Sequence, residues 1–212
     1  MIEQILGINN ITRAKLHLLE KRDSCGVDGM RLSELDEYIS NNMHALRASI
    51  MDGTYRPGLV QEVEQINYKG KIRTISKLTS VDRLILRAIH QVLYDKFSPL
   101  FSPFSYAYQE NKSIAYAARQ AADYVENGYG YSVDLDVDNF FDNVPHYKMG
   151  ELLLKYGLDN LTNNLIQKFL DCKIVRNFEI HPKEKGLVQG GLCRARHKPP
   201  YAGIDDMPSK CC

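Results

Sequence analysis

The sequence has 212 residues and a formal net charge of +1, with 44% hydrophobic and 25% charged residues. This balance excludes a disordered or fibrous chain, and the length suffices for one core or for two small lobes around a cleft. No apolar stretch approaches the ~20 residues that a bilayer requires, and no signal peptide opens the chain. We therefore expect a cytoplasmic protein without membrane association, and the near-neutral charge does not by itself indicate nucleic-acid binding.

The first expected elements are a helix and a hairpin. Apolar residues recur three and four apart over residues 32–50, which predicts a helix with Ser33 as its cap. Residues 60–68 alternate like a strand, and the turn at 69–71 leads to an expected hairpin partner at 72–75.

Two further helices are expected over residues 80–97 and 113–126. Ser80 stands in the position of a cap for the first helix, whose apolar side chains form one stripe. Residues 98–112, between the two helices, are rich in Ser, Pro and aromatic residues, which predicts an ordered loop in which Tyr106 packs on the core.

The last third of the chain begins with strict alternation of apolar and polar residues over 131–137, which predicts a strand. Helices are expected at 147–156 and 161–171, followed by a short hairpin at 173–180. From residue 192 onward the hydrophobic periodicity is lost. These elements predict an α+β fold in which the 131–137 strand packs on helices.

Three carboxylates share one face of that expected strand. The period-two rule places Asp134, Asp136 and Asp138 opposite the apolar residues. Like charges at this spacing repel by several kcal/mol at an effective dielectric near ~20, and a bound cation would relieve that repulsion. Oxygen ligands of this kind suit Mg²⁺, with Mn²⁺ as the alternative ion. A strand with one solvated polar face explains the same pattern.

Residues 136–142, Asp-Val-Asp-Asn-Phe-Phe-Asp, resemble the first palm motif of reverse transcriptases. The resemblance implies that Asp136 is the first metal-binding aspartate and that Val137 offers its backbone carbonyl to a metal. It also implies that Phe141 is a steric gate against the 2′-hydroxyl of a ribonucleotide. Asp134 and Asp142 would then have supporting roles. Two adjacent Phe residues are also common in ordinary core packing.

A second match lies in the expected hairpin. Residues 69–75, followed by Val-Asp-Arg-Leu at 81–84, resemble the fingers motif of the same family, and this implies that Lys69, Lys71 and Arg73 meet the incoming triphosphate. Arg and Lys side chains on a short hairpin suit phosphate oxygens. A solvated basic turn is the alternative reading.

Further matches extend the resemblance in both directions. Residues 26–30 and 55–57 resemble the family's N-terminal extension and the segment ahead of the fingers, and residues 105–113 resemble the block that follows the fingers. In that last block Gln109 replaces the usual Arg. The nucleic-acid contacts implied by the resemblance are assigned to three basic residues, namely Arg56, Arg83 and Lys112.

Residues 185–191, Lys-Gly-Leu-Val-Gln-Gly-Gly, resemble the block whose Gln-Gly pair lines the nucleotide pocket, which implies that role for Gln189 and Gly190. Consecutive glycines allow a close approach of backbone to ligand, although they also make ordinary turns.

Taken in order, the matches identify the chain as similar to group II intron type reverse transcriptases and maturases. The resemblance implies a right-hand polymerase layout with a helical extension at 1–57, fingers at 58–130, a partial palm at 131–191 and a tail unlike the family at 192–212. It implies two-metal nucleotidyl transfer with an RNA template, a DNA primer and dNTP, together with intron RNA as a further partner.

The family continues from this point into a Pro-Leu-Ser-Pro helix and a Tyr-Ala-Asp-Asp hairpin, and neither follows here. Tyr201-Ala-Gly-Ile-Asp-Asp206 only imitates the latter, and we expect Asp205 and Asp206 to be tail residues. We therefore expect a chain truncated before its second catalytic motif and inactive alone. The alternatives are a non-catalytic RNA-binding or interaction module derived from this family, and an unrelated structural protein with a solvated acidic strand.

Overall fold

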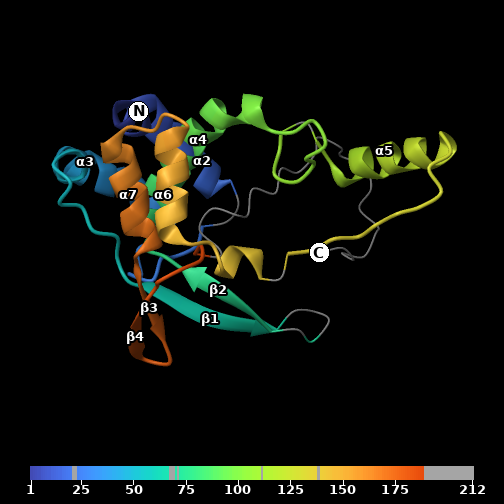
Figure 1. The fold of residues 1–212 in the computed structure, drawn as a ribbon. Helices are drawn as coiled ribbons and strands as arrows, with labels where there is room; N and C mark the ends of the chain where they lie inside the picture. Colours follow the sequence, from blue (N-terminus) through green and yellow to red (C-terminus); the bar gives the residue numbers. More distant parts are fainter. Residues whose placement is uncertain (21–22, 67–69, 71, 111, 138, 189–212) are drawn as a thin grey trace. The chain divides into compact units, whose positions relative to one another are not determined.

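The computed structural model describes residues 1–20, 23–66, 70, 72–110, 112–137 and 139–188 (Figure 1). They form two compact units, one containing residues 1–100 and 134–188 and the other containing residues 101–133. No helix in these described ranges is both long enough and apolar enough to cross a membrane.

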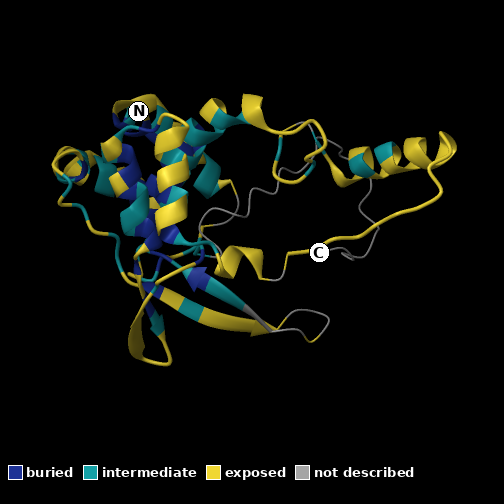
Figure 2. Ribbon diagram, in the orientation of Figure 1, coloured by how far each residue is buried: buried dark blue, intermediate teal, exposed yellow. Residues whose placement is uncertain are grey.

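The core of the first unit is helical. Its N-terminal part consists of α1 (Ile2–Ile5), α2 (Ile8–Leu19), the 3₁₀ turn η1 (Leu32–Glu34), α3 (Leu35–Met51) and α4 (Ser80–Phe97). Helix α4 lies at the centre, and its apolar stripe is fully buried at Leu84, Ile85 and Ala88. Figure 2 shows the buried residues gathered where these helices meet. Burying one Leu or Ile side chain stabilises the fold by ~1.5–3 kcal/mol, so α4 is a principal source of stability.

Helices α3 and α4 were predicted correctly, whereas no bounds were predicted for α1 and α2, and two predicted caps were wrong. The hydroxyl of Thr79, not Ser80, accepts the hydrogen bond from the Asp82 amide at 3.0 Å, while the Ser80 hydroxyl donates to the carbonyl of Met30 at 2.7 Å. The Ser33 amide and hydroxyl instead donate to Asp23, each at 3.1 Å. Adjacent hydroxyl residues are chemically equivalent as caps, so only the backbone conformation distinguishes them.

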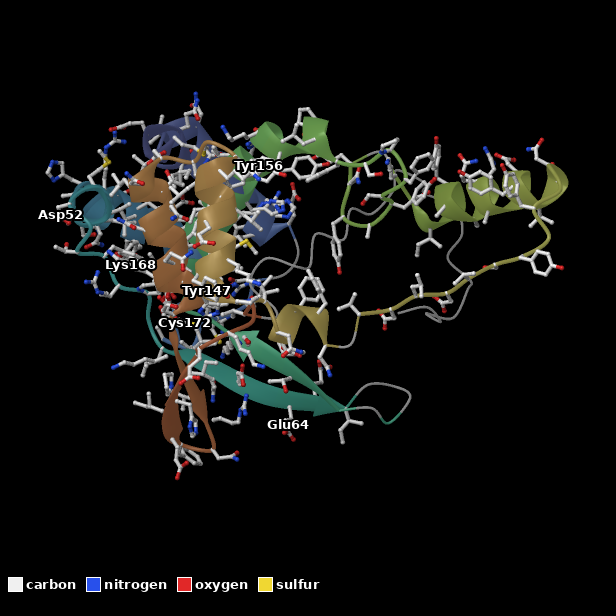
Figure 3. All side chains as sticks on the ribbon, viewed as in Figure 1. Asp52, Glu64, Tyr147, Tyr156, Lys168 and Cys172 are labelled. Carbon is white, nitrogen blue, oxygen red and sulfur yellow. The ribbon has the colours of Figure 1, made fainter. Side chains whose placement is uncertain are left out.

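Two helices from the later part of the chain complete the first unit. Helices α6 (His146–Lys155) and α7 (Asn160–Leu170) lie side by side (Figure 1), close to the predicted ranges. The Asp159 carboxylate caps α7 by accepting from the Thr162 amide at 2.8 Å. Figure 3 shows Lys168 on α7, whose ammonium donates to the carbonyl of Gly53, and the buried Cys172 where α7 leads into the sheet.

The sheet has four strands in the order β2-β1-β3-β4. Strands β1 (Val60–Ile66) and β2 (Ile72–Lys77) form the predicted antiparallel hairpin, and β3 (Lys173–Arg176) and β4 (Glu179–Pro182) form the second one. The pairing of β1 with β3 is parallel, with Val60 opposite Ile174. This pairing was not predicted, and it joins the two hairpins into one mixed sheet.

The strand predicted over residues 131–137 is not formed, so this prediction was wrong. No described strand pairs with this segment, and its apolar side chains are exposed, Val133 at 81% and Leu135 at 88%. Alternation indicates a strand only where a neighbouring strand can satisfy the backbone hydrogen-bonding groups. The short 3₁₀ turn η3 (Phe140–Asp142) follows this segment.

The second unit consists of a loop and α5 (Ile114–Glu126), which was predicted within one residue. The Ser113 hydroxyl caps the helix by accepting from the Tyr116 amide at 3.2 Å. No residue of α5 is buried. Tyr106, which was expected in the core, is instead half-buried against the Tyr116 ring at a centroid distance of 5.8 Å, because the loop folds on its own helix.

Candidate nucleotide site

Three segments of the first unit surround a hollow of about 780 Å³. One is the sheet, one is the turn around η3, and one is the chain between β4 and Val188. Hollows of ~300–1,000 Å³ are typical of small-molecule sites. The lining residues are Glu62, Thr74, Ser76, Asn139, Asp142, Ile174, Arg176, His181, Pro182, Lys183, Glu184, Lys185 and Leu187.

Backbone hydrogen bonds hold the last two segments together. The Leu187 amide donates to the carbonyl of Phe141 at 2.7 Å, and the Gly186 amide donates to the carbonyl of Val144 at 2.8 Å. Gly186 has φ +82°, and a Cβ added there would lie 2.7 Å from the carbonyl oxygen of Asp142. This close approach requires glycine, because a side chain would clash with the neighbouring backbone.

Charges of both signs line the hollow. Arg176 of β3 donates through Nε to Glu62 of β1 at 3.0 Å, and this hydrogen bond raises the pKa of Arg176. The Lys185 ammonium donates to the Asn143 side chain at 2.8 Å. Together with Lys183, these residues bring three cationic side chains to the hollow, while Glu62, Asp142 and Glu184 bring three carboxylates. Arg and Lys side chains of this kind suit phosphate oxygens.

The residues predicted to bind metal precede Asn139, a lining residue of the hollow, by three and two positions in the chain. Asp136 and Val137 are exposed on the extended chain that leads into η3. Asn139 adopts a left-handed conformation with φ 47° and turns the chain into η3. There the Phe141 ring packs edge-to-face on Phe140 at a centroid distance of 5.5 Å and is 38% exposed. Phe141 is therefore not a core residue, which leaves part of its ring free to meet a ligand.

Several predicted site residues cannot be placed. Lys69, Lys71, Gln189 and Gly190 lie outside the described residues, as do Asp138 and the tail beyond residue 188. The backbone of Arg73 is described, and it pairs with Gln65 within the β1–β2 hairpin. Thr74, the next residue along β2, lines the hollow.

The three residues predicted to contact nucleic acid all donate hydrogen bonds within the chain. Arg56 donates to the carbonyl of Tyr55 at 3.0 Å. Arg83 donates to the Ser24 hydroxyl at 3.1 Å beside a second hollow of about 390 Å³, and burial lowers the pKa of Arg83. In the second unit, Lys112 donates to the carbonyl of Ser105 at 2.7 Å. Each of these three side chains is thus held by hydrogen bonds within the chain.

Asp136 and Val137 offer oxygen atoms of the kind that a divalent cation binds. A carboxylate and a neighbouring carbonyl, both exposed, match the usual ligation of Mg²⁺, in which water and substrate phosphates complete the shell. Within the described ranges, no three acidic, histidine or cysteine side chains converge on one point. A second metal position would need further ligands.

Sequence reasoning missed one buried polar residue beside the hollow. His146, at the start of α6, contacts the carbonyl of Gly186 and the carboxylate of Asp171 through its two ring nitrogens. The only sequence signal was a histidine directly after Pro145 at the expected beginning of a helix, which does not reveal its partners.

Comparison with known proteins defines the class. Residues 61–193 match the family described as reverse transcriptase (RNA-dependent DNA polymerase). The match covers most of the chain, and the chain therefore belongs to the reverse transcriptase family. Its α+β fold and the predicted family resemblance are both confirmed.

The relatives narrow this class to the group II intron type. The group II intron-encoded protein LtrA of Lactococcus lactis subsp. cremoris is 27% identical over 159 residues, which are 74% of this chain and 26% of the relative. Protein YkfC of Escherichia coli (strain K12) is 23% identical over 171 residues, covering 79% of this chain and 45% of that protein. The chain thus corresponds to the fingers and palm region of this type, and it spans about a quarter of the length of the intron-encoded relative.

A solved structure shows the same fold. The partial Cas6-RT-Cas1–Cas2 complex aligns with a TM-score of 0.57 at 20% identity, over 89% of this chain and 31% of that chain.

Proposed function

We propose that this chain supplies the fingers and part of the palm of an RNA-directed DNA polymerase, and that the hollow beside η3 receives the incoming dNTP. One observation carries the proposal: the lining of the hollow includes residues from three segments that carry, or directly adjoin, separate family motifs. They are β2 beside Arg73, η3 with Phe141, and the chain that leads to Gln189.

The proposed roles follow from the chemistry of each segment. Lys69, Lys71 and Arg73 of the β1–β2 hairpin bind the triphosphate, since a guanidinium fork and ammonium groups match phosphate oxygens. The exposed edge of Phe141 excludes a 2′-hydroxyl. Gln189 and Gly190 line the pocket against the template base.

Asp136 and the carbonyl of Val137 would hold Mg²⁺, or Mn²⁺ in its place. In a two-metal site, the bound ions lower the pKa of the primer hydroxyl and neutralise the charge of the triphosphate. Asp136 would hold the ion, and the cationic side chains of Lys69, Lys71 and Arg73 would bind the phosphates.

The nucleic-acid partners are proposed to be an RNA template and a DNA primer, with intron RNA as a further partner. Arg56, Arg83 and Lys112 would contact their phosphates. We propose the extension at 1–57, the fingers at 58–130, the partial palm at 131–191 and a tail at 192–212. Because a two-metal site needs carboxylates from two places, we propose that these 212 residues bind dNTP but do not extend a primer by themselves.

The test is Mg²⁺-dependent binding of a fluorescent dNTP, measured alongside primer extension on an RNA template. Asp136→Ala should weaken Mg²⁺-dependent dNTP binding by about tenfold or more, because a direct ligand of the ion is lost. Asp134→Ala is the matched control, and it should bind nearly as well as the wild-type chain. Phe141→Ala should reduce the preference for dNTP over the matching ribonucleotide.

The outcomes separate the alternatives. Equal dNTP binding by wild type and Asp136→Ala would contradict the metal role. RNA binding that needs no Mg²⁺, in a chain without dNTP affinity, would favour a non-catalytic RNA-binding module. Primer extension that disappears in Asp136→Ala would show that these residues are active by themselves and would overturn that part of the proposal.

A further inference from the structure

His146 makes two hydrogen bonds from a buried ring. The residue is 6% exposed, with Nδ1 at 2.8 Å from Asp171 Oδ1 and Nε2 at 2.8 Å from the carbonyl oxygen of Gly186. The carbonyl oxygen of Gly186 only accepts hydrogen bonds, so the contact at Nε2 is a hydrogen bond in the ring forms that carry a proton on Nε2. A carboxylate also only accepts, so the contact at Nδ1 is a hydrogen bond in the ring forms that carry a proton there. The ring therefore joins the end of α7 to the chain that leads to the Gln-Gly pair.

The partner of Nε2, Gly186, lies between Lys185 and Leu187, which both line the hollow. Gly186 donates its amide to Val144, and the next residue, Leu187, donates to Phe141. These backbone bonds run between residues 141–144 and residues 186–187, whereas the His146 bond comes from the helix behind them. The Gly186 carbonyl is thus held by the imidazole, in addition to the two amide hydrogen bonds of this segment.

The backbone of His146 is itself fixed. The side-chain amide of Gln167 on α7 donates to the carbonyl of His146 at 3.3 Å. A Cβ added at Gly150 of α6 would lie 2.6 Å from the same Gln167 amide nitrogen, so α6 and α7 are in close contact here. The imidazole therefore projects from a rigid pair of helices and can impose a position on the loop.

We propose that His146 is a positioning residue, which clamps residues 185–187 against η3 and so sets the width of the nucleotide hollow. Buried behind Gly186, it does not line the hollow and acts only through Gly186 and Leu187. The effect of His146 on dNTP binding rests on the proposed dNTP site, whereas the clamp on residues 185–187 does not.

The experiment measures amide hydrogen exchange at Gly186 and Leu187, together with binding of Mg²⁺·dNTP. In His146→Asn the shorter side chain can still reach Asp171 but not Gly186, and both amides should exchange about tenfold faster than in the wild type. The affinity for dNTP should fall by about tenfold. His146→Gln places a donor near the position of Nε2 and should restore both values to within about threefold.

Two further variants complete the test. Asp171→Ala removes an exposed carboxylate that orients the ring, so it should fold and should show an intermediate increase in exchange. His44→Gln changes an exposed histidine on α3 and should alter neither value. If His146→Asn does not fold, Asp171→Ala together with His146→Gln decides the question.

Three results would contradict the clamp or the proposed function, and they can be told apart. Unchanged exchange at Gly186 and Leu187 in His146→Asn and Asp171→Ala would overturn the clamp. An equal acceleration at the buried amides of α4 would reveal a general loss of stability and would also overturn it. A wild-type chain without dNTP affinity would count against the proposed function, and the two exchange rates would then decide the clamp alone.

Discussion

The Tyr55 hydroxyl donates a 2.5 Å hydrogen bond to Asp82, a carboxylate buried in the first turn of α4. The same carboxylate accepts from the Gly58 amide at 2.9 Å and from the Thr79 hydroxyl at 2.7 Å. Asp82 thereby ties the chain just ahead of β1 to the central helix. The Asp82 side chain is thus one anchor of the base of the β1–β2 hairpin.

Tyr55→Phe should lower the free energy of unfolding by about 1–2 kcal/mol, because the buried Asp82 carboxylate loses one donor. Chemical denaturation of both proteins measures this difference. Tyr131→Phe is the matched control, since Tyr131 is fully exposed, and it should have no effect. Equal stability of Tyr55→Phe and the wild type would show that the hydrogen bond contributes nothing.

The same pair predicts a dependence on alkaline pH. Burial, reinforced by the charge of Asp82, raises the pKa of Tyr55 above the ordinary value of 10.0. The unfolded chain therefore loses this proton at a lower pH than the folded protein does. The contribution of Tyr55 is complete below pH 10.0 and decreases as the pH rises beyond it.

Denaturation at several pH values between about 8 and 11 measures this contribution. The stability difference between wild type and Tyr55→Phe should shrink above pH 10, because only the wild type has this group to ionise. The other tyrosines are common to both proteins and cancel in the comparison. A difference that stays constant over the whole range would contradict the prediction.

Gly186→Ala should destabilise the wall of the hollow by about 2 kcal/mol or more. The new Cβ would meet the backbone of Asp142 at 2.7–2.9 Å, and it would also strain a residue with φ +82°. Gly157→Ala separates these two effects. That glycine has φ +80°, but the nearest heavy atom to its Cβ is the flexible Lys96 ammonium at 3.5 Å. Thermal unfolding should show a clearly larger loss for Gly186→Ala, and equal losses would mean that the close approach is unimportant.

Phe178→Gly should stabilise the β3–β4 hairpin by about 1 kcal/mol. Asn177 and Phe178 form its two-residue turn with φ 51° and 66°, a conformation that favours glycine at the second position. The Phe178 ring is fully exposed, so no packing is lost. For a chain of this size, the melting temperature should rise by ~2–4 °C. Phe178→Ala, which keeps the strained backbone, should give no such rise.

Arg176→Ala should cost about 1–3 kcal/mol, because the Glu62 side chain is only 7% exposed and would be left without its partner. The exposure of Arg176 places the expected value toward the lower end of that range. Arg13→Ala breaks an ion pair in which both partners are exposed, and it should cost no more than ~0.5 kcal/mol. Similar effects of the two substitutions in urea denaturation would argue against a buried Glu62.

Local signals in the sequence were sufficient for most helices and for both hairpins. Helices α5, α6 and α7 lie within one or two residues of their predicted ranges, because apolar periodicity and caps such as Ser113 act within a single turn. Three of the segments that line the hollow were also found from sequence, since each carries or adjoins a short motif, whereas β3 and β4 carry none. Only the family resemblance implied that these segments lie close together in the fold.

Long-range pairing was not predictable in this way. The parallel ladder of β1 and β3 joins Val60 to Ile174, and no local pattern specifies a partner at that separation. The alternation over residues 131–137 indicated a strand, yet a strand also needs a neighbour. The contacts of His146 were hidden for the same reason, because its partners are 25 and 40 residues away.

The parallel pairing of β1 with β3 determines where the β1–β2 hairpin can bend. Strand β1 is joined to β3 only at Val60 and Gln61, whereas it is joined to β2 from Gln61 to Ile66. The base of the β1–β2 hairpin is therefore hydrogen-bonded to the β3–β4 hairpin, while its outer part is paired only within the β1–β2 hairpin. We expect any bending of β1 and β2 toward a ligand to pivot just beyond Gln61 and to leave the β3–β4 side of the hollow in place.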